Sequence, residues 1–238
     1  SRDKKKVRDI SFSVSRGEIL GFAGLVGSGR TELMDCLFGV DKRASGEIRL
    51  NGKTISPRSP LDAVKKGMAY ITESRRDNGF FPNFSIAQNM AIGRSLKSGG
   101  FKGAMGLFHE GDEQRTAEAQ RELLALKCHS VNQNITELSG GNQQKVLISK
   151  WLCCSPEVII FDEPTRGIDV GAKAEIYKVM RQLADDGKVI LMVSSELPEI
   201  IAVCDRIAVF CEGRLTQILT NRDDMSEEEI MAWALPQE

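Results

Sequence analysis

Residues 19–31 read ILGFAGLVGSGRT, an apolar run that leads directly into a glycine-rich loop. The run from Ile19 to Ala23 has the length of a strand buried in a parallel sheet. After Thr31 the apolar residues fall on one helix face, and Gly39 is a natural helix stop. The segment therefore predicts a strand, a loop and a helix in succession, the arrangement that binds phosphate at a helix N-terminus.

The loop at residues 24–31 has the frame G-x-x-x-x-G-K-[ST], with Arg30 at the lysine position. Glycines in this frame permit tight turns that aim backbone N–H groups at an anion. An arginine keeps the positive charge, but its planar fork is bulkier than an ammonium and does not fit the same cradle. The residues predicted to bind a nucleotide are Gly24, Gly27, Ser28, Gly29, Arg30 and Thr31.

A second buried strand is predicted in VIIFDEPT, residues 158–165. Asp162 ends the apolar run, which places a carboxylate at the carboxyl edge of a parallel sheet beside the loop. There Asp162 can hold Mg²⁺, usually through water, while the Thr31 hydroxyl supplies a direct ligand. Glu163 can polarise the water that attacks a γ-phosphate and is the candidate catalytic residue. The alternative is an acidic turn that merely ends a strand.

A second candidate anion site begins at LSGGNQQK, residues 138–145, where two glycines open a helix. Ser139 is predicted to cap this helix, whose free N–H groups and positive dipole end can receive an anion. The alternative is a helix cap without a ligand. The candidate residues of this signature segment are Ser139, Gly140, Gly141, Asn142 and Gln143.

Composition excludes several classes of protein. The 238 residues include 32 Lys and Arg against 33 Asp and Glu, a balance without the basic excess of nucleic-acid-binding domains. No apolar run approaches the roughly 20 residues of a membrane span, so we expect any membrane link to go through a partner. The six cysteines show no CxxC pair, and we predict reduced core thiols rather than disulfides or a metal cluster.

The remaining pattern predicts an α/β fold with a mostly parallel sheet. Alternation at residues 10–14 predicts a strand, Asn51-Gly52 a hairpin turn, and residues 189–193 and 207–210 further buried strands. A last hairpin is expected at residues 212–213, and Ser226 with Glu229 forms a capping box for a final helix. Residues 84–153 look mostly helical, with a loop at residues 98–106.

We therefore expect residues 1–238 to form a single domain with two lobes. Its core is assigned to residues 1–82 and 155–238 and includes an N-terminal antiparallel β subdomain. A helical insert subdomain is assigned to residues 83–154.

LSGGNQQK followed by FDEPTRGIDVGAK resembles the ATP-binding-cassette ATPases of ribose, galactose and allose import. The order along the chain agrees over nearly its whole length: glycine loop, helical insert, signature, Asp-Glu strand, D-loop (residues 167–169) and switch strand. The resemblance implies a P-loop NTPase cassette that uses ATP and Mg²⁺ and works in sugar transport. It also implies a location at the cytoplasmic face of the bacterial inner membrane.

The same resemblance implies partners. Two such cassettes face head to tail, so each nucleotide lies between one glycine loop and the opposite signature, whose residues 139–141 address the γ-phosphate. The loop GLVGSGRT resembles that of the C-terminal cassette of a two-cassette polypeptide, and the opening at Ser1 fits an excised piece. The implied partners are the N-terminal cassette of the same polypeptide, membrane permease subunits and, indirectly, a periplasmic sugar-binding protein, but no nucleic acid.

Four positions depart from the family pattern around the nucleotide of this loop. Arg30 replaces the lysine, Glu73 the glutamine that links Mg²⁺ to the helical lobe, and Ser195 the switch histidine; Ser1 stands where an adenine-stacking aromatic residue is expected. The signature departs only at Asn142. We therefore expect this loop to hold nucleotide weakly, with little turnover, while the signature completes the partner's competent site. Glu163 argues against a fully retired site.

Two other functions remain open. One is a non-hydrolytic regulatory or scaffold cassette that uses nucleotide as an assembly signal, which the altered loop favours. The other is a cassette acting on DNA or ribosomes, which the neutral charge and the lack of a long coiled-coil insert disfavour. Residues 79–85, GFFPNFS, are either packing between lobes or a contact surface for a membrane subunit. No motif residue distinguishes one sugar from another.

Overall fold

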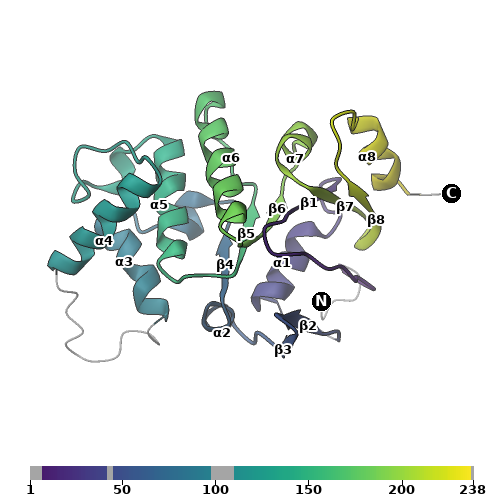
Figure 1. The fold of residues 1–238 in the computed structure, drawn as a ribbon, viewed down its shortest axis with the longest axis horizontal. Helices are drawn as coiled ribbons and strands as arrows, with labels where there is room; N and C mark the ends of the chain where they lie inside the picture. Colours follow the sequence, from purple (N-terminus) through teal and green to yellow (C-terminus); the bar gives the residue numbers. More distant parts are fainter. Residues whose placement is uncertain (1–6, 42–44, 98–109, 237–238) are drawn as a thin grey trace.

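The structure, a computed structural model, describes residues 7–41, 45–97 and 110–236. Within these ranges six strands form one sheet in the order β4-β5-β6-β1-β7-β8 (Figure 1). Neighbouring strands are parallel except for the antiparallel pair β7 and β8, which confirms the predicted mostly parallel sheet. The strands are β1 (Ile19–Gly24), β4 (Met68–Ile71), β5 (Val158–Asp162), β6 (Val189–Val193), β7 (Arg206–Cys211) and β8 (Arg214–Thr220).

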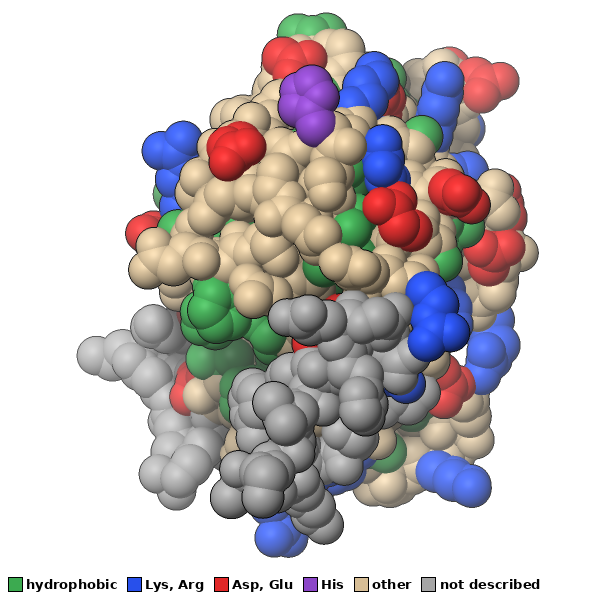
Figure 2. All heavy atoms as spheres, turned by 90° about the vertical axis from the view of Figure 1, so that its left-hand side faces the viewer, with side chains coloured by type: hydrophobic (Ala, Val, Ile, Leu, Met, Phe, Trp, Pro, Cys, Tyr) green, Lys and Arg blue, Asp and Glu red, His purple; other side chains and the backbone are tan. Residues whose placement is uncertain are grey.

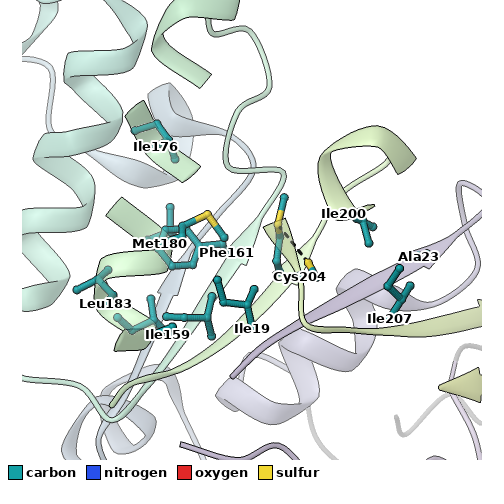
Figure 3. Close-up of a cluster of buried hydrophobic side chains, with 14 of the residues drawn as sticks. Ile19, Ala23, Ile159, Phe161, Ile176, Met180, Leu183, Ile200, Cys204 and Ile207 are labelled. Carbon is teal, nitrogen blue, oxygen red and sulfur yellow. Dashed lines mark hydrogen bonds between the residues drawn. The ribbon is translucent and has the colours of Figure 1, made fainter. Parts of the chain in front are cut away.

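Helices cover both faces of this sheet because successive side chains of a strand point to opposite faces. In β1, Ile19 packs with α6 (Val170–Asp185), α7 (Leu197–Val203) and α8 (Glu227–Ala234). Leu20 packs on the other face with α1 (Arg30–Phe38) and α2 (Pro60–Lys65). Figure 3 shows the first of these clusters, with strand residues meeting Met180 and Leu183 of α6. Burial of each such side chain stabilises the fold by about 1.5–3 kcal/mol.

A separate group of helices lies at one end of the sheet (Figure 1). It contains α3 (Ile86–Lys97), α4 (Glu110–Leu123), the 3-10 turn η2 (Ile135–Glu137) and α5 (Gly140–Leu152). These elements enclose their own apolar cluster, which includes Ile86, Met90, Ala117, Ile135 and Leu147. The prediction that residues 84–153 are mostly helical is confirmed for the described residues, although residues 124–134 form a non-helical connection between α4 and η2. The loop predicted at 98–106 lies outside the described residues.

Two predicted turns are confirmed. Strands β2 (Ile48–Leu50) and β3 (Lys53–Ile55) form a separate antiparallel pair, joined by Asn51 and Gly52 with φ of 51° and 75°. Positive φ at both central residues is the geometry that Asn-Gly favours in a tight hairpin. Glu212 and Gly213 repeat it between β7 and β8, with φ of 46° and 77°.

The capping box predicted for the last helix forms only in part. The Ser226 hydroxyl accepts from the backbone N–H of Glu229 at 3.2 Å, as a cap should. The Glu229 carboxylate does not return to the cap but takes two hydrogen bonds from Arg222. A guanidinium within reach offers that carboxylate two charge-assisted bonds, which are stronger than one bond from a backbone N–H.

The strand predicted at residues 10–14 is wrong. Ile10, Phe12 and Val14 do alternate with exposed serines and pack on the core beneath α1 and α2, but the segment has no strand pairing. Arg206 instead donates a side-chain hydrogen bond to the Ser13 carbonyl at 3.2 Å. Alternation therefore marked a half-buried extended segment, because the pattern reports burial and not the presence of a neighbouring strand.

Within the described part of the chain, none of the helices has both the length and the apolar character of a membrane span. None of the six cysteines, all of which the structure describes, forms a disulfide; Cys36, Cys154, Cys204 and Cys211 are buried, and Cys128 and Cys153 are half-buried. On the face shown in Figure 2, basic and acidic side chains are interspersed. The described part of this face shows no extended basic patch of the kind that binds a nucleic-acid backbone.

Candidate nucleotide site

The glycine loop connects β1 to α1 in a backbone conformation that suits glycine. Gly24, Gly27 and Gly29 have φ of 149°, 81° and 102°, values that other residues rarely adopt. A Cβ at Gly24 would collide with the carbonyl oxygen of Phe210 on β7. The loop therefore follows the end of the sheet closely before α1 begins.

Ser28 supplies an independent sign that the loop fits an anion. Its hydroxyl oxygen is buried and has no hydrogen-bond partner among the residues that the structure describes. A buried polar atom left unpaired destabilises a fold by about 1–3 kcal/mol. Phosphate oxygens are acceptors for such a hydroxyl and for the N–H groups at the start of α1. The loop thus fits the phosphates of a nucleotide.

Asp162 and Thr31 lie together at the carboxyl edge of the sheet. The Thr31 hydroxyl donates to Asp162 Oδ1 at 3.4 Å, and the Tyr70 hydroxyl donates to Asp162 Oδ2 at 2.9 Å. Burial raises the pKa of Asp162 to about 6, although the Tyr70 and Thr31 hydrogen bonds oppose the rise. Carboxylate and hydroxyl oxygens side by side are a donor set that fits Mg²⁺.

Glu163 follows directly and adopts φ of 49°, a left-handed conformation that is uncommon outside glycine. Its backbone N–H donates to the Val193 carbonyl at 2.9 Å, which ties the end of β5 to the end of β6. Ser195 Oγ donates to Glu163 Oε2 at 3.2 Å. The structure therefore places the predicted switch position directly on the candidate catalytic carboxylate.

Arg30 is buried, with 7% of its surface exposed. Its Nη1 donates to the Ser194 carbonyl beyond the end of β6. Burial lowers the pKa of Arg30, while Glu163 and Asp162 raise it; an arginine retains its charge under such opposing influences. The guanidinium thus lies within the site and is engaged by the protein's own backbone.

The signature segment is built differently from the prediction. Ser139 stands at the N-cap of α5, but its side chain makes no capping hydrogen bond. Ser139 Oγ instead accepts from Asn142 Nδ2 at 2.9 Å, so the nearby amide occupies the oxygen expected to cap the helix. The first-turn N–H groups are therefore not satisfied by Ser139, and they keep their capacity for an anion.

The other predicted residues of the signature, Gly140 to Gln143, make contacts within this chain. Gln143 is buried and donates to the Leu138 carbonyl at 3.1 Å. Asn142 Oδ1 accepts from the Lys127 N–H at 2.9 Å. The atoms nearest to a Cβ built on Gly140 belong to Gly167 and Arg75 and not to the glycine loop. Gly141 packs on α6 so closely that an added Cβ would lie 2.5 Å from Ala172 Cβ.

Glu73 lies outside the group at the sheet edge. It forms an ion pair with Arg166, the residue before the D-loop, and both side chains are largely exposed. The structure thus brings together Arg30, Thr31, Asp162, Glu163 and Ser195, whereas Glu73 and residues 139–143 lie at the D-loop and α5. Ser1 is outside the described residues.

A buried carboxylate that no sequence pattern indicated supports the site. Glu199 on α7 accepts hydrogen bonds from Thr165 Oγ1 at 2.7 Å, Ser194 Oγ at 3.0 Å and Lys173 Nζ at 2.7 Å. Burial acts to raise the pKa of Glu199, but Lys173 and the hydroxyl donors outweigh it and hold the pKa below its usual value. The network fixes the Ser194 segment against the strand end that bears Glu163.

Tyr70 was also missed. Its hydroxyl bonds Asp162, and burial, with the nearby Asp162 and Asp35, raises its pKa well above the usual value. A tyrosine in the short run MAYI, residues 68–71, was the available signal, because a buried phenol needs a hydrogen-bond partner.

Comparisons with known proteins agree with this geometry. Residues 7–166 match the family model described as ABC transporter. The chain is 95% identical over 238 residues to the D-allose import ATP-binding protein AlsA of Escherichia coli (strain K12), covering all of this chain and 47% of that protein. It is 46% identical over 233 residues to the ribose import ATP-binding protein RbsA of Bacillus cereus (strain ZK / E33L), covering 97% and 46%.

The fold is also that of solved ATP-binding cassettes. One neighbour is a nucleotide-free ATP-binding cassette from an ABC transporter, with 20% identity, a TM-score of 0.82 and coverage of 98% of this chain and 93% of that chain. Another is a dimeric post-hydrolysis cassette bound to ADP and Pi, with 20% identity, a TM-score of 0.75 and 91% coverage of each chain. The chain spans about half the length of the curated relatives it matches.

Proposed function

The chain belongs to the ABC transporter family, and from this premise we propose that it is one of two ATP-binding cassettes that power monosaccharide import through a membrane permease. The single observation that carries the proposal is the meeting of glycine loop, Thr31, Asp162 and Glu163 at one sheet edge. Identity of 95% with a D-allose import protein supports a sugar of that class. The half-length match supports a second cassette in the same polypeptide.

We propose ATP and Mg²⁺ as the ligands of this site. Backbone N–H groups at the start of α1, together with the unpaired Ser28 hydroxyl, would hold the phosphates. Thr31 and Asp162 would hold the ion, Thr31 directly and Asp162 through water. When bound, Mg²⁺ neutralises the charge that develops on the phosphates. Glu163, at the end of β5, would orient the attacking water.

In our proposal this site is the weaker of two. Each of the three altered positions described by the structure is already engaged by the protein itself. Arg30 donates to the Ser194 carbonyl, Glu73 pairs with Arg166, and Ser195 donates to Glu163. A nucleotide would have to compete with these contacts, which lowers its affinity and the availability of the catalytic carboxylate.

The signature would act on the partner. The first turn of α5 has N–H groups that Ser139 does not cap, and it lies at the D-loop, away from the chain's own glycine loop. Such a turn can receive the γ-phosphate of a nucleotide on the opposite cassette. This chain is therefore proposed to complete a competent site that it does not itself hold.

Residues 79–85 are proposed to contact the permease. Phe81 and Phe84 are 51% and 40% exposed and stack with ring centroids 5.3 Å apart. Buried Asn89 holds their backbone, accepting from the Phe81 N–H at 2.8 Å and donating to the Phe81 carbonyl at 3.1 Å. A stacked aromatic pair on a fixed loop offers apolar area to a partner without further ordering.

An adjacent pocket adds a polar rim, lined by Asn83, Ser85, Gln88, Asn132 and Asn134. Docking at these residues would hold the cassette at the cytoplasmic face of the bacterial inner membrane, with a periplasmic sugar-binding protein acting indirectly.

A regulatory cassette that holds nucleotide without hydrolysis is the second candidate. The engagement of Arg30 by the Ser194 carbonyl favours it, because the cation is partly withdrawn from the phosphates. Glu163 at the strand end argues against it, since a site that only binds needs no carboxylate there.

Nucleotide titration of this cassette, alone and joined to its partner cassette, separates the two functions. Binding and phosphate release would be followed together. If the chain is part of an import ATPase, turnover should appear only in the joined protein. If it is a regulatory cassette, its affinity for nucleotide should change when the partner is joined, without turnover in either protein. Turnover by this cassette alone, independent of its concentration, would contradict the composite site.

A further inference from the structure

A single π-helical turn, η1 (Arg75–Gly79), lies between β4 and the proposed docking segment at residues 79–85. Turns of this type are rare and occur mostly at functional positions. Ser74 caps the turn by accepting from the Asp77 N–H at 3.4 Å, and the Phe80 N–H closes it on the Arg75 carbonyl at 3.2 Å. The first end of this turn contacts the D-loop, and the second end contacts α5.

At the first end, Arg75 donates hydrogen bonds to the backbone at the start of the D-loop. Its Nη1 donates to the Arg166 carbonyl at 2.9 Å and its Nη2 to the Gly167 carbonyl at 3.1 Å. Two successive carbonyls thus accept hydrogen bonds from the two terminal nitrogens of one planar guanidinium. A lysine ammonium cannot reproduce this geometry. Gly167 has φ of 67°, so the backbone turns here in a conformation that favours glycine.

The same guanidinium lies against the first residue of α5. A Cβ built on Gly140 would lie 3.4 Å from Arg75 Nη2 and 3.3 Å from the Gly167 carbonyl oxygen. The absence of a side chain at Gly140 therefore lets the start of the signature helix approach both the D-loop and Arg75. Three segments distant in sequence meet at one side chain.

At the other end, η1 is tied to the body of α5. Lys150 Nζ donates to the Gly79 carbonyl, and a Cβ on Gly79 would lie 2.9 Å from Leu147 Cδ1. Phe80, which follows, is buried among the helices, and Phe81 and Phe84 are exposed. Residues 79 and 80 therefore connect the exposed pair to α5, and Arg75 connects the same turn to the D-loop.

We propose that Arg75 is a positioning residue that holds the D-loop and the first turn of α5 in one arrangement and joins both to the docking segment. The inference rests on the proposed function, because the D-loop and signature have work to do only opposite a second cassette. Arg75 itself touches no nucleotide in this proposal. It acts through the backbone carbonyls of Arg166 and Gly167 and through its packing on Gly140.

The test uses the full-length two-cassette polypeptide assembled with its membrane subunits. Arg75→Ala, Arg75→Lys and Arg76→Ala would be compared with the wild type for kcat and for the KM of ATP. Arg76 is the matched control, since it is the next residue of the same turn, carries the same charge and is exposed.

We expect Arg75→Ala to lower kcat by roughly tenfold or more, the loss that corresponds to one charge-assisted hydrogen bond. The KM of ATP should change by less than about twofold, because ATP first binds the opposite glycine loop, which Arg75 does not contact. Arg75→Lys should recover only part of the rate, and Arg76→Ala should retain it.

A second readout is hydrogen exchange at the amides of residues 166–169, which should become faster in Arg75→Ala and not in Arg76→Ala. Equal effects of the Arg75 and Arg76 changes would overturn the proposal, as would full recovery by Arg75→Lys or a rise in KM matching the fall in kcat. If Arg75→Ala does not fold, the kcat of Arg75→Lys is the deciding measurement: a partial loss supports the proposal, and an unchanged kcat overturns it. Absence of turnover in the wild type would refute the proposed function instead, since exchange still tests the Arg75 contact.

Discussion

The Ser195 hydroxyl donates a hydrogen bond to Glu163 Oε2 across 3.2 Å. The residue at the switch position thus holds the carboxylate that would activate water, and the two strand ends that carry them are also joined by the Glu163 N–H bond to the Val193 carbonyl. Because Glu163 is already hydrogen-bonded to Ser195, it is less available to activate water at this site. Substitution of Glu163 measures how much this site contributes to turnover.

Replacing Glu163 with Gln should have a small effect on the full-length two-cassette polypeptide. We expect ATP turnover to fall by less than about twofold, because the asymmetric proposal assigns most hydrolysis to the other glycine loop. The equivalent substitution in the partner cassette is the matched comparison and should abolish most of the turnover. Equal losses from the two substitutions would show that both sites hydrolyse ATP, contrary to the asymmetric proposal.

Replacing Arg30 with Lys should strengthen nucleotide binding. A lysine ammonium fits the phosphate cradle and gives up the hydrogen bond to the Ser194 carbonyl. We expect ATP to bind this cassette about tenfold more tightly, a gain of about 1.4 kcal/mol, measured by calorimetric titration.

Arg30→Ala is the control and should bind ATP more weakly than the wild type. It should also reduce the free energy of unfolding by about 1.5–3 kcal/mol, because the Ser194 carbonyl loses a charged donor. If Arg30→Lys binds ATP with the same affinity as the wild type, Arg30 does not weaken nucleotide binding at this site.

The 238-residue chain on its own should hydrolyse almost no ATP at micromolar concentration. In the proposed composite site the signature is supplied by the partner cassette, and loss of such electrostatic donors lowers rates by about a hundredfold or more. Phosphate release would be measured across a range of protein concentrations, with circular dichroism confirming the fold. A rate proportional to protein concentration and comparable to that of the full-length polypeptide would be incompatible with a shared site.

A photoreactive phenylalanine analogue at position 84 should crosslink to a permease subunit in the assembled transporter. Phe84 is 40% exposed and stacked on Phe81, so the analogue keeps the local packing. The same analogue at Leu123, which is 63% exposed on α4, is the control and should give no such product. Crosslinking from position 123 alone would place the permease elsewhere.

The contribution of Lys150 to stability should rise with pH, opposite in sign to that of the cysteines, whose pKa values burial raises. Burial lowers the pKa of this lysine to about 8, although Cys154 opposes the shift, whereas an unfolded lysine titrates near about 10.4. Between these values Lys150 binds more protons in the unfolded chain than in the folded one, so its contribution to the free energy of unfolding increases with pH by up to roughly 1.4 kcal/mol per pH unit.

Lys150→Met should remove this contribution, so that in urea unfolding its free energy of unfolding rises less, or falls more, across the interval than that of the wild type. Lys178→Met, at an exposed position of α6, should retain it. An identical pH profile in Lys150→Met and the wild type would refute the assignment to Lys150.

Much of the fold was open to prediction because buried strands are local features. The runs at residues 19–23, 158–161, 189–193 and 207–210 are apolar without interruption, and each forms a strand of the central sheet. The Asn51-Gly52 turn was predictable for a similar reason, since its positive φ values suit those two residues. Strand β4 and helix α2 were missed, although Ser59 and Pro60 form a capped helix start.

By itself, the sequence determined that a glycine loop follows a buried strand and that acidic residues end another, because residue spacing decides burial and backbone conformation over a few residues. Only the tertiary structure decided which groups meet. Arg30 bonds a carbonyl 164 residues away and Arg75 bonds carbonyls 91 and 92 residues away. Such contacts depend on which strands become neighbours and on the paths of the loops between them, and no local pattern contains that information.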